Sequence, residues 1–447
     1  MHTMTPLSLK DVLIEKLAEA ISAPLPVFTP RQIRGVVSLP GKATAVVGMR
    51  RAGKTTFLHQ LRRDKFNQGT PLTHLPYLNF EDERLAGLEA VHLGFLLDEF
   101  ARRTTGGPGP VRATWFFDEI QVVPGWERFV RRLLDTGASD VVVTGSSAAL
   151  LSREIATALR GRAWEASLYP FSFAEAMRHQ GRDIPPEAAF LSGMERAGIE
   201  RAFLDWLTVG GFPEVQGLDQ GSRRRLLQDY VDVAILRDVV ERHGVSNVIG
   251  LRWLVRHLLG NAAGTFTVEK FHAGLKSQGV AISRDTVHQL LAHLEDCFLV
   301  RAVWMEATSE RQRMVNPRKT YPIDPGLIPL FDRSGRRNHG HALETAVLIE
   351  LERRRCAATY VRTPEGHEVD FLARDPLGNE TLIQVCLDAS EPTTAHRELR
   401  ALAEAARPHP KAGKLLLTLN KDGAPADIPE DVTVCPAYEW MLTEPTE

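Results

Sequence analysis

The chain has 447 residues, of which 43% are hydrophobic and 25% charged, values that are ordinary for a soluble globular protein of about two to four domains. Its formal net charge of −2 gives no overall positive field, so binding to nucleic acid would have to use local basic patches. Four cysteines without a C-x-x-C pair indicate neither a zinc site nor a disulfide framework. Charges interrupt the N-terminal stretch and the apolar runs are strand-sized, so we expect a cytoplasmic protein with neither a signal peptide nor a membrane helix.

The first 170 residues alternate short apolar runs with helical patterns. A helix is predicted at 9–23, directly before a proline-rich stretch. Further on, the pattern predicts strands at 44–47, 74–79, 115–117 and 141–144, and helices at 55–63, 93–103 and 126–134. Because short buried strands separated by helices are typical of a parallel sheet, we predict an α/β core here.

The rest of the chain has a different character. Residues 173–260 are mostly helical by pattern, with a Gly-Gly-Phe-Pro turn at 210–213. Three helices and a strand, predicted at 251–260, 266–276, 283–296 and 298–303, indicate a helix–turn–helix with a wing. A second α/β region follows, with helices predicted at 342–354 and 393–406 and strands near 359–362, 368–373, 381–385 and 414–419.

One glycine-rich turn carries a complete nucleotide-binding motif. The run from Gly48 to Thr55 (GMRRAGKT) matches G-x-x-x-x-G-K-[ST], and it follows a predicted strand and opens a predicted helix, as the motif requires. Lys54 would reach the β- and γ-phosphates of ATP, while the Thr55 hydroxyl would bind Mg²⁺. The other residues expected to bind the nucleotide are Gly48, Arg50, Arg51, Ala52, Gly53 and Thr56. A P-loop that binds ATP without hydrolysing it is the alternative.

Two acids follow the strand predicted at 115–117. Asp118 would hold Mg²⁺, and Glu119 would polarise the attacking water. Both would lie at the carboxyl edge of the sheet, where open α/β sheets bind ligands. The alternative, an acidic cap on the next helix, is weak beside a complete P-loop.

Polar side chains after the last predicted strand of this region complete the candidate site. Thr144 or Ser146 would sense the γ-phosphate or orient water, although a serine here could also cap a helix. Arg160 and Arg162 are candidates for an arginine finger, acting within the chain or from a neighbouring subunit, and a solvated arginine is the alternative.

Taken together, these motifs resemble those of a family of bacterial and archaeal AAA+-type P-loop ATPases with a C-terminal domain of uncharacterised function. The matching segments are GMRRAGKTT, YLNFEDERL, FFDEIQ, VTGSSAALL, LRGRAWEASLYPFSFAEA, GGFPEV, RDVVERHG, KTYPIDPGL and HALETAVLIELERR. The resemblance implies an α/β protein with a RecA-like AAA+ P-loop NTPase core at 1–170, a helical lid at 171–250, a winged helix at 251–312 and a restriction-endonuclease-like α/β domain at 313–447.

The helix–turn–helix could bind DNA or could serve only as a packing module. Arg284, His288 and Gln289 are expected on the exposed face of its second helix. That helix carries one arginine against three acids, which is unfavourable for contact with phosphates.

The C-terminal region resembles a nuclease fold whose motif is Asp followed by Glu-x-Lys. Glu344 and Asp370 match the first two acid positions, but Gln384 stands where the next acid belongs and Cys386 where the lysine belongs. A neutral amide is a poor Mg²⁺ ligand, and a thiol cannot replace a fixed cation. We therefore expect a degenerate module without nuclease activity.

The sequence thus predicts an ATP-binding protein, a Mg²⁺-dependent ATPase that acts as a conformational switch. The alternative is a nucleotide-gated DNA-binding protein with weak or regulatory ATPase activity. Besides ATP, DNA and a second copy of the chain are candidate partners, and no membrane partner is expected.

Overall fold

The computed structural model describes residues 8–104, 112–137, 139–145, 161–182, 192–332 and 338–443. The chain forms two compact units, Met1–Leu168 and Tyr169–Glu447. Within the described residues, none of the helices is long and apolar enough to cross a membrane. The division into four domains predicted above stays a prediction.

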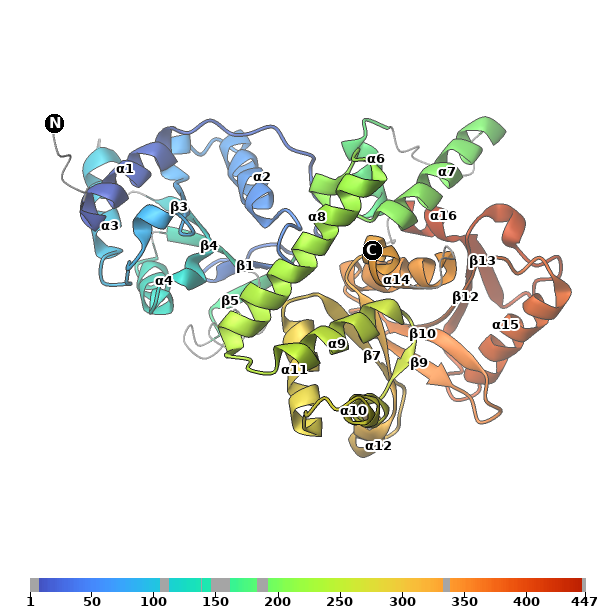
Figure 1. Cartoon of the computed structure of the whole chain (residues 1–447). Helices are drawn as coiled ribbons and strands as arrows, with labels where there is room; N and C mark the ends of the chain where they lie inside the picture. Colours follow the sequence, from blue (N-terminus) through green and yellow to red (C-terminus); the bar gives the residue numbers. More distant parts are fainter. Residues whose placement is uncertain are drawn as a thin grey trace. The chain divides into compact units, whose positions relative to one another are not determined.

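The first unit is built on a five-stranded sheet in the order β2-β3-β4-β1-β5, and every neighbouring pair is parallel (Figure 1, blue to teal). Its strands are β1 (Ala43–Val47), β2 (Tyr77–Asn79), β3 (Ala113–Asp118), β4 (Ser139–Gly145) and β5 (Ala163–Ser167). Its helices are α1 (Leu9–Ser22), α2 (Lys54–Asn67), α3 (Gly94–Thr104) and α4 (Trp126–Asp135). The predicted parallel α/β core is confirmed, while β5 was not predicted as a strand.

Burial explains why these apolar runs form central strands. Every residue of β1 and of β3 is buried, as expected for parallel strands that are covered by helices on both faces. Val46 of β1 and Phe116 of β3 pack with Phe57 and Leu58 of α2 in one apolar cluster. The helix after the P-loop is therefore held against the two strands that carry the motifs.

The strand order brings the predicted motifs together. β4 lies between β3 and β1, with Val143 opposite Phe117 on one side and Gly145 opposite Val47 on the other. The segments that leave these three strands consequently start from one edge of the sheet. The P-loop, the acid pair and Thr144 share that edge.

The second unit begins with helices, as the pattern predicted for 173–260. They are α6 (Phe173–His179), α7 (Gly193–Val209), α8 (Gln220–Val233), a π-helical segment (Ala234–Glu241) and α9 (Val248–Gly260). The helix–turn–helix follows as α10 (Val268–Ser277) and α11 (Arg284–Asp296). The short helices α12 (Glu310–Val315) and α13 (Ile328–Phe331) precede α14 (His339–Arg353), α15 (Pro392–Ala405) and α16 (Ala437–Leu442).

A mixed eight-stranded sheet forms the centre of this unit, in the order β13-β12-β11-β10-β9-β7-β8-β6. The strands are β6 (Thr265–Phe266), β7 (Val300–Met305), β8 (Arg318–Pro322), β9 (Ala357–Arg362), β10 (Glu368–Arg374), β11 (Glu380–Cys386), β12 (Gly413–Thr418) and β13 (Val432–Pro436). Helices α14 and α15 lie on either side of it, over two separate apolar clusters (Figure 1). One sheet therefore runs across the boundary predicted after residue 312.

Candidate functional site

Two glycines fix the shape of the P-loop. A Cβ on Gly48 would lie 2.1 Å from the carbonyl oxygen of Leu168, so no larger residue fits there. Gly53 adopts φ 98°, a left-handed conformation that favours glycine, and caps α2 without a side-chain hydrogen bond. No acid occupies the first turn of α2. The positive end of the helix dipole is therefore available to a phosphate at the loop.

The lysine of the motif is folded back onto its own loop. The Lys54 ammonium donates hydrogen bonds to the carbonyls of Gly48 at 3.1 Å and Met49 at 3.2 Å, and its side chain is only 5% exposed. The nearest carboxylate, that of Glu119, is 3.8 Å away. A cation that is held mainly by neutral carbonyls can exchange them for phosphate oxygens, which are stronger acceptors.

Asp118 is the centre of a network of hydroxyl groups. Its buried carboxylate accepts hydrogen bonds from Thr55 at 2.7 Å, Thr144 at 2.5 Å and Tyr77 at 2.8 Å. Burial, followed by the charge of Asp118, raises the pKa of Tyr77 well above its ordinary value, so the phenol stays a donor. The predicted metal-binding pair, Thr55 and Asp118, is therefore in direct contact.

Glu119 is held in a strained conformation beside this network. It adopts φ 53° and ψ 41°, which is uncommon for a residue other than glycine. Its backbone N–H donates to the Thr144 hydroxyl at 2.8 Å, and the Gln121 side-chain amide donates to its carboxylate. Thr144 therefore connects both acids, whereas Ser146, the other candidate at this position, lies outside the described residues.

Among the described residues, neither candidate for an arginine finger, Arg160 or Arg162, is seen beside the P-loop. Arg162 precedes β5, its carbonyl accepts from Ala43 at the start of β1, and its side chain pairs with Asp135. It therefore lies at the opposite edge of the sheet from the P-loop, a position that does not favour a finger role within the same chain, and that role stays a prediction. A role from a neighbouring subunit stays a prediction, and Arg160 lies outside the described residues.

The other P-loop residues predicted to bind the nucleotide have the following positions and contacts. Arg50 pairs with Glu81 at 3.0 Å, Arg51 adopts φ 66°, and Thr56 is half-buried on α2. The Ala52 carbonyl accepts a hydrogen bond at 2.7 Å from the buried guanidinium of Arg31.

Three contributors to this site, Arg31, Tyr77 and Gln121, were missed from the sequence. Arg31 and Tyr77 reach the site only through tertiary packing, since each bonds to a partner far along the chain. Gln121 follows Glu119 by two residues, so the sequence shows that the two residues are close. It does not show that the Gln121 side chain turns toward the Glu119 carboxylate.

A second cluster of charged groups lies in the second unit, on β8, β10 and α14. The Lys319 ammonium lies 2.9 Å from Glu344, 2.8 Å from Glu368 and 3.0 Å from Asp370. Tyr321 donates to Glu344 at 2.6 Å. The sequence pattern had indicated that the cation of the nuclease motif was lost, but a lysine from another strand contacts both predicted acids.

Burial and mutual repulsion govern this cluster. Burial, followed by the charge of Asp370, raises the pKa of Glu344 to about 8. Burial alone would lower the pKa of Lys319, but the carboxylates around it raise it well above its ordinary value. Among the described residues, no group of three or more His, Cys, Asp or Glu side chains is arranged to hold a metal ion.

The other two positions of the nuclease pattern are engaged elsewhere. Gln384 donates to Glu398 of α15 at 2.8 Å, and the Cys386 thiol donates to the Asp388 carbonyl. Burial raises the pKa of Cys386, which keeps the thiol neutral.

Comparison with known proteins agrees with the first of these sites. Residues 40–177 match the model of an AAA domain, and residues 200–335 match a domain of unknown function. An uncharacterised protein of the archaeon Methanocaldococcus jannaschii is 32% identical over 417 residues, which cover 91% of this chain and 89% of the relative. The chain belongs to the family of this archaeal protein.

A bacterial member of comparable similarity is an uncharacterised protein of Haemophilus influenzae, 29% identical over 351 residues, which cover 78% of this chain and 83% of the relative. The AAA domain of the family confirms the predicted P-loop NTPase core and implies a nucleotide ligand, typically with Mg²⁺.

Solved structures with similar chains include a Walker-type ATPase of Pyrococcus abyssi, with 16% identity and a TM-score of 0.36 over 72% of this chain and 95% of that one. An ORC2 protein of Aeropyrum pernix has 13% identity and a TM-score of 0.34 over 74% and 95%. These values are too low to support an argument about function.

Proposed function

We propose that this protein is a Mg²⁺-dependent ATPase of the AAA+ type that acts as a conformational switch. The observation that carries the proposal is the bonding of Asp118 to Thr55 at 2.7 Å and to Thr144 at 2.5 Å, with Glu119 3.8 Å from Lys54. Five residues predicted from separate motifs thus form one connected group.

The residues fit the nucleotide and the metal ion. Gly48 and Gly53 carry no side chain, so backbone N–H groups can approach a phosphate at the loop. A hydroxyl and a carboxylate are oxygen ligands of the kind that Mg²⁺ prefers, so Thr55 and Asp118 would hold it. When bound, Mg²⁺ neutralises negative charge on the phosphate oxygens.

The proposed chemistry uses residues of this chain. Glu119 accepts a proton from water while the water oxygen bonds to the γ-phosphorus, and the bond from that phosphorus to the bridging oxygen breaks to give ADP and phosphate. Lys54 leaves its two carbonyl partners and stabilises charge on the phosphates. Gln121 holds the Glu119 carboxylate, and Thr144 holds the Glu119 backbone.

The switch follows from the same contacts. Lys54 and Glu119 have different partners with and without the γ-phosphate, so hydrolysis rearranges the hydrogen bonds at the ends of three strands. We propose that this rearrangement changes the conformational state of the second unit, in which the helical lid, the winged helix and the nuclease-like module are the predicted parts.

The experiment is ATP turnover by the wild type and by Lys54→Ala, each with and without duplex DNA. The proposal predicts Mg²⁺-dependent turnover that Lys54→Ala abolishes. Turnover that survives in this variant would place the activity elsewhere.

A second candidate function is nucleotide-gated DNA binding by α11. It is supported by the exposed positions of Arg284, His288 and Gln289 on that helix, although Asp285 is exposed beside them. Salt-dependent binding to duplex DNA that weakens with Arg284→Ala would support this candidate. Binding that is unchanged in a chain lacking residues 261–305 would rule it out.

A further inference from the structure

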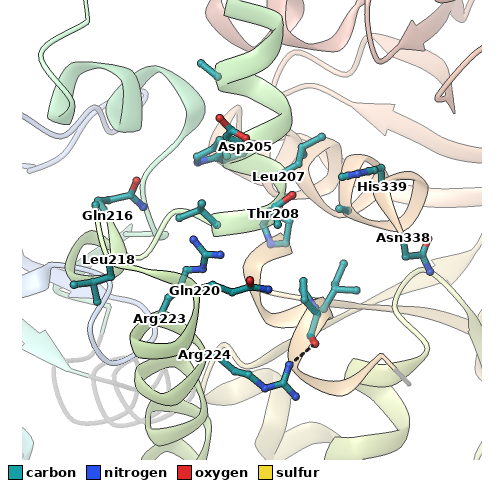
Figure 2. A pocket seen from close by; sticks show the side chains of 18 of the residues that line it. Asp205, Leu207, Thr208, Gln216, Leu218, Gln220, Arg223, Arg224, Asn338 and His339 are labelled. Atoms are coloured by element: carbon teal, nitrogen blue, oxygen red, sulfur yellow. Dashed lines mark hydrogen bonds between the residues drawn. The ribbon is translucent and has the colours of Figure 1, made fainter. Parts of the chain in front are cut away.

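A large cavity in the second unit has no role in the proposed ATPase chemistry. Its volume is about 760 Å³, which lies in the range of small-molecule sites, and described residues line it. Its walls come from α7, from the segment before α8 and the first turn of α8, from α13 and from the start of α14 (Figure 2). Leu207, Leu218 and Ile328 form apolar parts of the wall.

Arg223 is the group in this cavity that most needs a partner. It is half-buried in the first turn of α8, and among the described residues no carboxylate lies within ion-pair distance of its guanidinium. A cation in the first turn of a helix is unfavourably placed beside the positive end of the helix dipole. No described carboxylate therefore pairs directly with Arg223, although Asp205 and Asp332 also line the cavity, and a bound anion would supply a direct partner.

The neighbouring arginine is used differently. Arg224 donates to the carbonyls of Pro329 at 3.1 Å and Leu330 at 3.3 Å, and so stabilises the end of α13 (Figure 2). This contact holds two walls of the cavity together and leaves Arg223 as the half-buried arginine that faces its interior.

The start of α14 adds a second positive contribution. This helix has 15 residues, a neutral cap in Asn338 and no acid in its first turn. Asn338 and His339 both line the cavity, so the positive end of a long helix opens into it. A guanidinium and a helix N-terminus are a combination that suits a phosphate group.

The other polar groups indicate what accompanies the phosphate. Asp205 of α7 lines the cavity, and no described cation lies within ion-pair distance of it. Gln216 also lines the cavity, and its amide nitrogen donates to the carbonyls of Gly210 at 2.9 Å and Phe212 at 3.1 Å. The Asp205 carboxylate suits a hydroxyl or amino donor on the same ligand.

We propose that this cavity binds a phosphorylated small molecule that also carries hydroxyl or amino groups. Arg223 and the start of α14 hold the phosphate, and Asp205 accepts a hydrogen bond from a donor elsewhere on the ligand. This site is separate from the P-loop, and its proposal does not depend on ATP hydrolysis.

The test uses the full chain with Lys54→Ala, which weakens phosphate binding at the P-loop, and titrates ribose 5-phosphate, inorganic phosphate and ribose by calorimetry. Ribose 5-phosphate should bind more tightly than phosphate, and ribose should not bind. Arg223→Gln should weaken both phosphate probes about tenfold, the loss of roughly one charge-assisted bond. Asp205→Asn should weaken ribose 5-phosphate and leave phosphate unchanged.

Arg225→Gln is the matched control, since Arg225 is an exposed arginine of the same helix that does not line the cavity. It should leave every affinity unchanged. Equal effects of Arg223→Gln and Arg225→Gln, or no binding of either phosphate probe at millimolar concentrations, would overturn the proposal.

Discussion

Each of the two units holds a buried lysine beside carboxylates, and the two lysines are bonded in opposite ways. Lys54 bonds two backbone carbonyls at 3.1 and 3.2 Å, and its nearest carboxylate is 3.8 Å away. Lys319 lies within 3.0 Å of the carboxyl groups of Glu344, Glu368 and Asp370. Both side chains are 5% exposed, so burial does not distinguish them.

The different partners of the two lysines indicate different roles, ligand binding for Lys54 and stabilisation of the fold for Lys319. Lys54 can leave neutral carbonyls for phosphate oxygens at little cost. Lys319 would have to give up three charge-assisted contacts in a buried setting, where an uncompensated charge is expensive. We propose that the same residue types serve ligand binding in the first unit and internal stability in the second, and the absence of nuclease activity stays a prediction.

The largest effect on stability is expected from Lys319→Met. Removing the cation leaves three acidic side chains close together without their shared partner, so we expect a loss of about 3–5 kcal/mol in the free energy of unfolding. Calorimetric unfolding of the full chain measures it. Lys54→Met is the matched control, and its free energy of unfolding should fall much less, because no carboxylate lies at hydrogen-bond distance from Lys54. Equal losses in the two variants would contradict the distinction between the two lysines.

Thr144→Val should have the next largest effect. Its hydroxyl is fully buried and bonds both Asp118 and the backbone of Glu119, so its loss should destabilise the chain by about 1–3 kcal/mol. ATP turnover should fall more than ATP affinity does, since Glu119 loses its anchor. Steady-state kinetics and nucleotide titration separate the two, and a purely affinity-based defect would contradict the proposed role.

The pH dependence of stability tests the second cluster. The Glu344 carboxyl has a pKa of about 8 when folded against an ordinary value of 4.5, so the folded chain binds its proton more tightly. Its contribution to stability is present below pH 4.5 and is lost as the pH rises toward about 8. Urea unfolding across this window should show the decline, and Glu344→Gln should flatten it. An unchanged slope in Glu344→Gln would show that another group titrates.

The smallest effect is expected from Tyr77→Phe. It removes one of three hydroxyl donors to Asp118, at a cost of about 0.5–1.5 kcal/mol in the free energy of unfolding. Because Thr55 and Thr144 still bond the carboxylate, ATP turnover should fall only a few-fold. A loss as large as that of Thr144→Val would mean that Tyr77 touches the reacting groups.

The P-loop site could be predicted from the sequence because its residues belong to short sequence motifs. Lys54 and Thr55 follow one strand and Asp118 follows another, and the carboxyl ends of parallel strands share an edge. The choice between Thr144 and Ser146 could not be made, since the sequence does not say which side chain turns toward Asp118. The position of Arg162 was missed because β5 was not expected as a strand.

The second cluster could not be found in the same way. Lys319 contacts residues 25 and 51 positions away, across strands whose order has no local signal. The nuclease motif places its lysine two residues after the position of Gln384, where this chain has Cys386, which lies on the same strand but outside the cluster.

The most direct test of the account is ATP turnover by Glu119→Gln and Glu344→Gln, each in the full chain. Both changes replace a carboxyl group near a buried lysine with an amide, but only Glu119 is assigned to the reaction. We predict that Glu119→Gln lowers kcat by a factor of about 10²–10⁴ and retains ATP binding, while Glu344→Gln turns over ATP like the wild type. Unchanged turnover in Glu119→Gln, or an equal loss in both variants, would contradict the assignment of the active site to the P-loop.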